Sequence, residues 1–408
     1  MINVIGLGYI GLPTALMFAA SGNKVVGTDI LKEKINDLKN GVIPFEEKGI
    51  QKLYNEAVEN NIQFTTEYQE TDMYIITVPT PYNRETKRID PTYVKEATKI
   101  ATNKALNDAV IVIESTVSPG TIDKHVRPII EEAEKKLNKK IYLVHAPERI
   151  LPGNMIYELR HNSRTIGSDN LEAAKKVEAI YETFCESEIV ITDIRTAEMS
   201  KVIENTYRDI NIAFANELAK ISRFDDLNVY EIIRIANKHP RVNILNPGPG
   251  VGGHCISVDP WFLVGDYPEH TNLIQQAREI NDSMPAFTLK RIHDIMLKEG
   301  IKDISRVGLY GLTYKPNVDD TRESPTLQLL EKQRQSLAPE LKVYDPMVRD
   351  INITANQYES FEEFMGDIDL VVIMVGHDHL KTNKDQFEGK VILDMQNIFS
   401  ESEKIYYI

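Results

Sequence analysis

The residues best placed to do chemistry lie in one glycine-rich segment, residues 248–260. Cys255, one of two cysteines in the chain, follows a run of glycines, and Asp259 stands four residues later. Glycines leave little side-chain bulk, so a substrate could approach this backbone closely. A thiol in such a setting is typical of a nucleophile that attacks an electrophilic carbon. A small cysteine buried behind a turn is the alternative, and it is the usual state of a free cysteine.

A second glycine-rich turn lies between a predicted strand, Ile2–Ile5, and a predicted helix, Gly11–Ser21. The amides and the dipole of a helix that begins this way hold a pyrophosphate. Asp29 ends the next predicted strand, 18 residues after Gly11. A carboxylate there accepts hydrogen bonds from ribose hydroxyls and repels a 2′-phosphate, which favours NAD over NADP. The alternative is an ordinary glycine turn with a surface aspartate. The predicted cofactor contacts are Gly6, Gly8, Tyr9, Ile10, Gly11 and Asp29.

Two further loops follow predicted strand ends, and they contain Thr80 and Thr116. Ligands bind outside the carboxyl ends of parallel strands, so both hydroxyls could contact the nicotinamide half of the cofactor. Turn-forming and helix-capping roles are equally compatible with the sequence.

Composition narrows the class of protein. The chain has 408 residues, too many for one compact core, and its formal net charge is −14. That charge argues against non-specific binding to nucleic acid or to acidic membranes, and the apolar runs are far too short to span a membrane. The chain opens on a strand with no leader before it, and two cysteines imply no disulfide framework. We therefore expect a cytoplasmic protein, with no metal site.

Short apolar runs alternate with helical patterns through the first 190 or so residues, which predicts a parallel sheet covered on both faces. The predicted strands are Ile2–Ile5, Lys24–Thr28, Met73–Val78, Val110–Glu114, Lys140–His145 and Glu188–Thr192. The predicted helices are Gly11–Ser21, Leu31–Asn40, Gly49–Asn60, Pro91–Leu106, Thr121–Leu137 and Asn170–Phe184. Cys185 is expected to lie in a helical stretch and to be structural.

A long helix without internal glycine or proline is predicted over Thr196–Phe224, as a connector and a dimer surface. The alternation then resumes in a second sheet. Its predicted strands are Val307–Tyr310, Leu341–Tyr344, Leu370–Val375 and Val391–Asp394. The predicted fold is α/β, with two Rossmann-like doubly wound domains joined by the long helix. The expected domains are residues 1–193, 194–300 and 301–408.

A cysteine nucleophile combined with NAD indicates oxidation of an aldehyde through a thiohemiacetal and a thioester. Such chemistry needs a group that stabilises an oxyanion. Lys201, Asn205 and Arg208 share one face of the long helix, and Lys201 with Asn205 could hold an alkoxide. Exposed polar residues with no such role are the alternative.

Taken together, these motifs resemble those of the UDP-glucose/GDP-mannose dehydrogenase family from end to end. The matching blocks are residues 6–11, 146–149, 201–205, 248–260, 311–316 and 320–325. The resemblance implies oxidation of a sugar C6 alcohol to a carboxylate with two NAD. It implies that Cys255 forms the thioester and that Lys201 and Asn205 stabilise oxyanions. Asp259 would activate Lys201 or a water, and Glu148 would be the base for hydrolysis. His254 is excluded from the catalytic set because adjacent side chains rarely converge.

The same resemblance implies a UDP-sugar substrate and local positive charge to bind it. The implied substrate contacts are Arg149, Ile150, Lys201, Asn205, Arg208, His239, Arg241, Gly252, Tyr314 and Lys315, and Arg322 is an implied cofactor contact. In this family the arginine that matches Arg241 often crosses from the partner subunit, which implies a homodimer or a larger homo-oligomer.

The sugar is indicated by one departure from the UDP-glucose enzymes. Those enzymes have a second glutamate four residues after the one that matches Glu148, and here that position is Pro152. Together with residues 239–245 and 258–262, this pattern resembles enzymes that act on UDP-N-acetylmannosamine and supply a donor for surface polysaccharide. Enzymes acting on UDP-N-acetylglucosamine are the near alternative, and UDP-glucose enzymes are a more distant one. A two-electron dehydrogenase of the hydroxy-acid or 6-phosphogluconate type, or a non-catalytic NAD-binding scaffold, would not need Cys255.

Overall fold

The computed structural model describes residues 1–335, 340–350, 352–400 and 402–408. The chain divides into two compact units at a point inside one long helix. The N-terminal unit holds Met1–Glu204 and Gly265–Tyr267, and the C-terminal unit holds Asn205–Val264 and Pro268–Ile408. The division into three domains stays a prediction. Within the described residues, no helix combines the length and the apolar character needed to cross a membrane.

The N-terminal unit is built on one sheet with the strand order β3-β2-β1-β4-β5-β6-β7-β8. Its strands are β1 (Ile2–Ile5), β2 (Val25–Thr28), β3 (Gln63–Thr65), β4 (Thr71–Ile76), β5 (Ala105–Ile113), β6 (Ile141–His145), β7 (Arg164–Ser168) and β8 (Ile189–Thr192). All pairs are parallel except β6 with β7, where Val144 pairs with Ser168. The expectation of a purely parallel sheet is wrong at that pair. Only the short helix α6 (Met155–His161) lies between these two strands. A parallel neighbour needs a crossover connection that returns the chain to the same end of the sheet, whereas an antiparallel neighbour does not.

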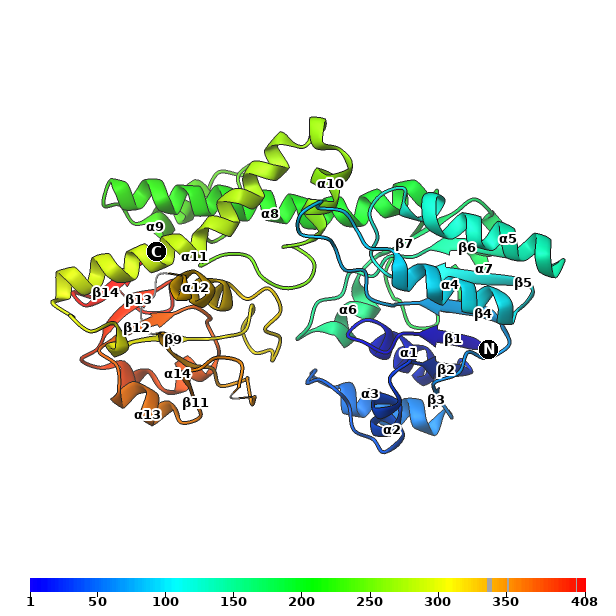
Figure 1. Ribbon diagram of the computed structural model, residues 1–408, viewed down its shortest axis with the longest axis horizontal. Helices are drawn as coiled ribbons and strands as arrows, with labels where there is room; N and C mark the ends of the chain where they lie inside the picture. The colour runs from blue at the N-terminus through cyan, green and yellow to red at the C-terminus, as the bar shows by residue number, and fades with distance from the viewer. Residues whose placement is uncertain (336–339, 351, 401) are drawn as a thin grey trace. The chain divides into compact units, whose positions relative to one another are not determined.

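Helices cover both faces of this sheet, because buried strands project apolar side chains alternately to either side. One core lies under α1 (Gly11–Ala20), α3 (Ile50–Glu59), α6 and α7 (Leu171–Tyr181), and α2 (Lys32–Lys39) contributes Ile35 and Leu38 to it. The other core lies under α4 (Thr92–Lys104) and α5 (Arg127–Leu137), which pack side by side (Figure 1).

Some predicted element boundaries are wrong. Leu106 lies in β5 and not in the preceding helix, because the extended backbone begins at Ala105. The helix predicted over Thr121–Leu137 opens with a π-helical turn, Ile122–Val126, before α5. Cys185 lies beyond the end of α7 and not in a helix, but it is buried, with Sγ 3.6 Å from the carbonyl oxygen of Asn162. That environment fits the structural role expected for it.

The long helix α8 (Ile194–Phe224) begins two residues before its predicted start and is drawn in green in Figure 1. Three of its large apolar side chains, Ile203, Phe214 and Ile221, are exposed. After it come α9 (Val229–Ala236), α10 (Asp259–Asp266), a 3₁₀ turn (Pro268–His270) and α11 (Asn272–Glu299).

The sheet of the C-terminal unit has the order β11-β10-β9-β12-β13-β14, and every pair in it is parallel. Its strands are β9 (Val307–Tyr310), β10 (Lys342–Tyr344), β11 (Gln357–Tyr358), β12 (Leu370–Ile373), β13 (Val391–Asp394) and β14 (Ile405–Tyr407). One face packs on α9, α11, α12 (Pro325–Arg334) and part of α8, with α11 beside α12 in Figure 1. The other face packs on α13 (Phe361–Gly366) and the segment that includes α14 (His379–Thr382). The predicted class, two Rossmann-like α/β sheets with a long helix between them in sequence, is confirmed.

Both sheets contain the same turn. After the first strand of each, a glycine with positive φ donates its N–H to the last residue of the second strand: Gly6 to Thr28 and Gly311 to Tyr344, both at 2.8 Å. An aspartate directly after that second strand then accepts the N–H of the residue that follows the glycine. These pairs are Leu7 with Asp29 and Leu312 with Asp345. The two domains therefore form the turn after their first strand with the same set of hydrogen bonds.

Candidate active site

The glycine turn after β1 fits a dinucleotide. A Cβ on Gly11 would lie 1.8 Å from the carbonyl oxygen of Gly6, so the turn requires a glycine where α1 begins. A Cβ on Gly8 would meet no protein atom within 4 Å, so packing does not explain that glycine and it leaves open space at the helix N-terminus. The residue before α1, Ile10, has no capping side chain. The N–H of Leu12 already donates to the carbonyl oxygen of Gly8 at 3.1 Å and Pro13 has no N–H, so the helix dipole, more than the first amides, favours an anion at this end. Tyr9 stacks on Phe45 at 4.5 Å.

Asp29 shows how the adenosine end would be held. Its Oδ2 accepts the N–H of Leu7, and its Oδ1 accepts the N–H of Leu31 at 3.0 Å. Lys34 on α2 donates to Oδ2 at 2.9 Å, and its side chain is partly exposed. Sequence reasoning missed Lys34. Its position five residues after Asp29, on the next predicted helix, was the available signal.

Thr80 and Thr116 come together at neighbouring strand ends of the same sheet. The hydroxyl of Thr80 donates to the carbonyl oxygen of Thr116 at 2.7 Å, and both residues are partly exposed. They therefore lie at the ligand-binding edge of the sheet, as predicted for parallel strands.

Glu148 belongs to a buried charge cluster that sequence reasoning missed. Its Oε2 accepts a hydrogen bond from Arg164 Nη2 at 2.6 Å, and Arg164 Nη1 lies 3.6 Å from Glu114 Oε1. Tyr181 donates to Glu114 at 2.8 Å, and the guanidinium of Arg164 stacks 4.4 Å above the Tyr181 ring. Burial, followed by the charge of Glu148, raises the pKa of Glu114 to about 8. One arginine thus faces two carboxylates, of which Glu114 holds its proton near neutral pH.

The two residues after Glu148 point into the N-terminal unit. Arg149 donates to Thr165 at 2.7 Å and pairs with Glu204 at 3.2 Å. The side chain of Ile150 lies in the hydrophobic core, so a substrate contact there would have to come from its backbone.

On α8, the i and i+4 spacing places Lys201 and Asn205 on one face, and both side chains are buried. Asn205 Nδ2 donates to Asp259 Oδ2 at 2.6 Å, so two of the predicted catalytic residues are in direct contact. Arg208 belongs to the same predicted face but is exposed. Lys201 and Asn205 therefore share a buried environment, and Arg208 does not.

The glycine-rich loop places Cys255 in the turn that leads into α10, four residues before the helix begins. The Cys255 carbonyl oxygen accepts the N–H groups of Val258 at 3.0 Å and of Asp259 at 2.8 Å, which closes a turn that brings Asp259 to the first position of the helix. Cys255 is partly exposed, unlike Cys185. This geometry favours the nucleophile over the buried alternative.

Two glycines before Cys255 have a packing role beside the approach of a substrate that the sequence predicts. A Cβ on Gly252 would lie 2.6 Å from the Cβ of Tyr314, and one on Gly253 would lie 2.8 Å from its ring. The N–H of Gly253 also donates to the carbonyl oxygen of Arg322 at 2.9 Å. These glycines thus let the cysteine loop pack on the loops that follow β9.

The remaining predicted substrate and cofactor residues belong to the C-terminal unit. His239 and Arg241 lie exposed in the turn after α9. Tyr314 and Lys315 lie in the loop after β9, and Arg322 pairs with Asp320 at 2.6 Å in the segment that follows. Among the described residues, no cluster of three or more histidine, cysteine or acidic residues is arranged to hold a metal ion.

Three models of one family match successive parts of the chain. They are the NAD binding domain over residues 1–185, the central domain over 195–283 and the UDP binding domain over 308–401 of the UDP-glucose/GDP-mannose dehydrogenase family. The chain belongs to this family. It is accordingly an NAD-dependent oxidoreductase, as its sequence predicted, and the turn with Gly6, Gly11 and Asp29 lies in the NAD binding domain.

Relatives in this family match over nearly the whole chain. A UDP-N-acetyl-D-mannosamine dehydrogenase of Methanocaldococcus jannaschii is 43% identical over 99% of this chain and 95% of its own length. Among solved structures, the UDP-N-acetyl-mannosamine dehydrogenase of Staphylococcus aureus is 41% identical with a TM-score of 0.88, covering 100% of this chain and 97% of that one. A UDP-D-ManNAc dehydrogenase of Pyrococcus horikoshii is 37% identical with a TM-score of 0.91, covering 100% and 99%.

Proposed function

We propose that this protein oxidises UDP-N-acetyl-D-mannosamine at C6 to UDP-N-acetyl-D-mannosaminuronate. The observation that carries the chemistry is the contact between Asn205 and Asp259 at the turn that Cys255 begins. This contact places the Asn205 amide beside the Asp259 carboxylate, and the turn that carries Asp259 begins at the partly exposed Cys255 thiol. The similarity to enzymes named for this sugar along the whole chain supports the substrate.

The four-electron reaction needs a covalent stage, because the aldehyde must be held for a second oxidation. NAD, when bound, supplies the hydride acceptor for both oxidations. The Cys255 thiolate adds to the aldehyde carbon and gives a thiohemiacetal, which becomes a thioester when it loses hydride. Lys201 and Asn205 donate hydrogen bonds to the oxyanions, and Lys201 also exchanges the alcohol proton. Asp259 orients the Asn205 amide.

Hydrolysis of the thioester consumes one water and releases the Cys255 thiol and the carboxylate product. Glu148 takes the proton from that water, directly or through a second one. Its hydrogen bonds to Arg164 and to the N–H of Arg149 fix the direction of the carboxylate. In the remaining binding roles, Thr80 and Thr116 serve the nicotinamide, Arg322 the cofactor, and Tyr314, Lys315, His239 and Arg241 the UDP-sugar.

The sugar choice is attributed to the loop that contains Pro152. Glu47 holds this loop in place because its carboxylate accepts hydrogen bonds from the N–H groups of Gly153 at 2.6 Å and Met155 at 3.0 Å. Glu158 accepts the N–H of Leu151 at 2.7 Å. UDP-N-acetylglucosamine differs from the proposed substrate only at C2, so it is the second candidate.

The test counts NADH formed per sugar nucleotide consumed, with UDP-N-acetylmannosamine, UDP-N-acetylglucosamine and UDP-glucose supplied separately. The expected result is two NADH for each molecule of the manno sugar and little from the others. One NADH per sugar would contradict the covalent mechanism. Two NADH from the gluco sugar alone would keep the mechanism and overturn the substrate.

The protein also forms a homodimer in this proposal. Tyr207, Phe214 and Ile221 are seven residues apart on α8, share one face and are exposed. Phe214→Glu should convert a dimer into monomers in a light-scattering measurement. A wild-type protein that is already monomeric would contradict the dimer and the crossing of Arg241 between subunits.

A further inference from the structure

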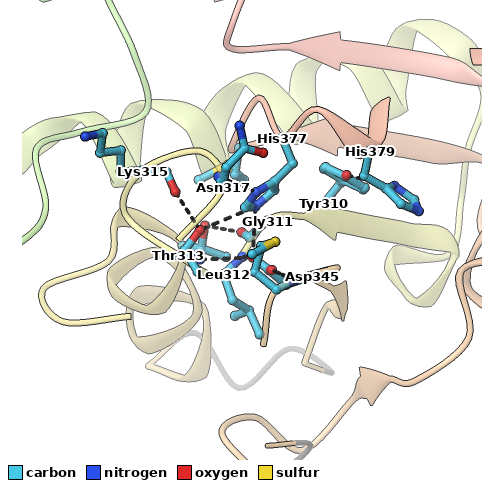
Figure 2. Close-up of polar contacts among 12 residues, drawn as sticks. Tyr310, Gly311, Leu312, Thr313, Lys315, Asn317, Asp345, His377 and His379 are labelled. Carbon is cyan, nitrogen blue, oxygen red and sulfur yellow. Dashed lines mark hydrogen bonds and ion pairs between the residues drawn. The ribbon is translucent and has the colours of Figure 1, made fainter. Parts of the chain in front are cut away.

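The loop after β9 carries Tyr314 and Lys315, and it is supported from behind by two buried side chains. Asp345 follows β10 and His377 follows β12, so the support comes from the ends of the two strands that flank β9. Both side chains are completely buried, and His377 Nε2 lies 3.2 Å from Asp345 Oδ2. Figure 2 shows the pair among residues of the loop, with the Lys315 side chain extending away from it. The proposed function does not assign a role to either residue.

Both carboxylate oxygens of Asp345 accept hydrogen bonds from other groups of the protein. Its Oδ2 accepts the N–H groups of Leu312 at 2.5 Å and Thr313 at 3.1 Å, in addition to the contact with His377. Its Oδ1 accepts the N–H of Met347 at 2.7 Å. Burial raises the pKa of this carboxyl, but the bonds from His377 and the backbone outweigh burial and lower it overall. Asp345 therefore supports the loop as a carboxylate and is not placed to bind a ligand.

The hydrogen bonds of His377 define its protonation state. Its Nδ1 lies 3.0 Å from the backbone nitrogen of Asn317, which can only donate. Nδ1 must then be an unprotonated acceptor, and the ring proton is on Nε2, facing Asp345. The hydroxyl of Thr313, which donates to the Lys315 carbonyl at 3.0 Å, lies 3.3 Å from the same Nε2. A neutral imidazole thus holds both ends of the segment Thr313–Asn317.

We propose that His377 and Asp345 are positioning residues that hold the loop with Tyr314 and Lys315 in its UDP-binding conformation, and that this holds only while His377 is neutral. The inference rests on the proposed function of that loop. A proton on Nδ1 would turn the acceptor for the Asn317 N–H into a donor, so the two groups would repel and the far end of the loop would be released. UDP-sugar affinity therefore falls at acidic pH.

Other titratable groups face His377 as well. Asp378 follows it in sequence and accepts a hydrogen bond from Asn317 Nδ2 at 3.0 Å. Lys381 pairs with Asp378 at 2.6 Å. From β9, the Tyr310 ring lies 6.0 Å away, and its hydroxyl is 3.1 Å from Nδ1 of His379. Asp345 is the nearest charge to the imidazole, but neither Asp345 nor Asp378 can replace the acceptor that the Asn317 N–H loses.

The equivalent turn in the N-terminal unit supports a positioning role and argues against a ligand contact. Asp29 accepts two of the three corresponding backbone N–H groups, and its side-chain partner is Lys34, which is 23% exposed. Asp345 has His377 in that place, with no exposed surface. The Asp29 carboxylate therefore lies beside a partly exposed side chain that a ligand can reach. The Asp345 carboxylate is enclosed and can act only through the loop.

The test measures binding of UDP-N-acetyl-D-mannosamine without NAD by calorimetry at a series of pH values from about pH 5.5 to about pH 8. Both phosphates of this probe are esterified, so the probe does not titrate there. We expect wild-type affinity to fall about tenfold at the acidic end, the effect of one lost hydrogen bond. His377→Asn keeps an acceptor oxygen near the Nδ1 position but cannot be protonated, so it should bind nearly as well as wild type at pH 8 and lose the pH dependence.

Two further variants separate positioning from general damage. His377→Phe should bind the probe about tenfold more weakly at every pH, with NAD affinity unchanged as evidence of an intact N-terminal unit. His379→Asn, a neighbouring histidine outside the loop contacts, should keep the wild-type pH profile. The inference is overturned if wild-type affinity is constant with pH or if His377→Phe binds normally. A wild-type protein that binds no UDP-N-acetylmannosamine at any pH would instead overturn the proposed substrate.

Discussion

Replacing Arg164 with methionine should strongly destabilise the N-terminal unit. The side chains of Arg164, Glu148 and Glu114 are 6%, 4% and 0% exposed, so water cannot take over the role of the guanidinium. Methionine preserves the length of the side chain and makes favourable contacts with aromatic rings, here Tyr181 and Phe184. The substitution therefore removes the positive charge with little change in packing.

The expected loss follows from leaving a buried carboxylate without its partner. Breaking one side of a buried ion pair costs roughly 3–5 kcal/mol. In a domain of this size, each kcal/mol lowers the melting temperature by about 2–4 °C, so the unit should melt roughly 6–20 °C below wild type. Glu148, 2.6 Å from Arg164, is the carboxylate left unpaired, because Glu114 already holds a proton near neutral pH.

Differential scanning calorimetry of the full chain without NAD would measure this loss, since bound cofactor would add its own stabilisation. Arg127→Met is the matched control. Arg127 also bridges two carboxylates, Asp123 at 2.8 Å and Asp169 at 2.6 Å, but its side chain is 33% exposed. Surface pairs contribute about 0–1 kcal/mol, so this control should melt close to wild type.

A second substitution tests whether the lost charge is the cause. Glu148→Gln in the Arg164→Met background removes the unpaired carboxylate, so the double variant should melt above Arg164→Met alone. Equal melting temperatures for Arg164→Met and Arg127→Met, or no recovery in the double variant, would refute the assignment of this cluster as a stabilising ion pair.

Three other predictions follow from the site. Cys255→Ser should reduce NADH formation from two to at most one per sugar consumed, because an oxygen at this position is a poorer nucleophile and leaving group; undiminished stoichiometry would exclude the thioester. Gly252→Ala should raise KM for the UDP-sugar and cost about 1–3 kcal/mol of stability, since its Cβ would meet Tyr314, whereas Gly248→Ala, with no atom within 4 Å of its Cβ, should behave as wild type. Burial and the charge of Glu148 raise the pKa of Glu114 to about 8, so between about pH 5 and pH 8 the folded state binds a proton that the unfolded chain has released. The free energy of unfolding therefore falls as pH rises through this window, and Glu114→Gln should flatten that decline; melting curves of equal slope for the two proteins would contradict the raised pKa.

The strands of the fold could be predicted where burial on both faces makes them continuous apolar runs. Val307–Tyr310 and Val391–Asp394 occur with the predicted boundaries for this reason. The strand Arg164–Ser168 was missed because it begins with an arginine and ends with glycine and serine, and that arginine is buried only through Glu148 and Glu114 from elsewhere in the chain. Edge strands such as Gln63–Thr65 and Gln357–Tyr358 are too short to give a periodic signal.

Local spacing was sufficient for the parts of the site that lie on one element. Lys201 and Asn205 share a face because they are one helical turn apart, and Asp259 follows Cys255 within a single turn of chain. The contact between Asn205 and Asp259 joins residues that are 54 positions apart. The sequence could predict only that both residues take part in catalysis. The packing of Tyr314 against the glycines near Cys255 could not be predicted, because the two segments are about 60 residues apart in the sequence.

The repeated turn limits what an aspartate at a strand end can tell about a cofactor. Asp29 and Asp345 both accept the N–H of the residue after a positive-φ glycine, and both accept a second N–H two positions further along their own segment. That carboxylate is thus required first by the turn itself, whatever the domain binds. What differs most is the side-chain partner: a lysine five residues away for Asp29 and a histidine 32 residues away for Asp345. Beside its lysine, the Asp29 side chain keeps 8% of its surface exposed, whereas Asp345 is completely buried beside its histidine. The informative signal in this sequence was therefore the spacing of Asp29 and Lys34, more than the aspartate alone.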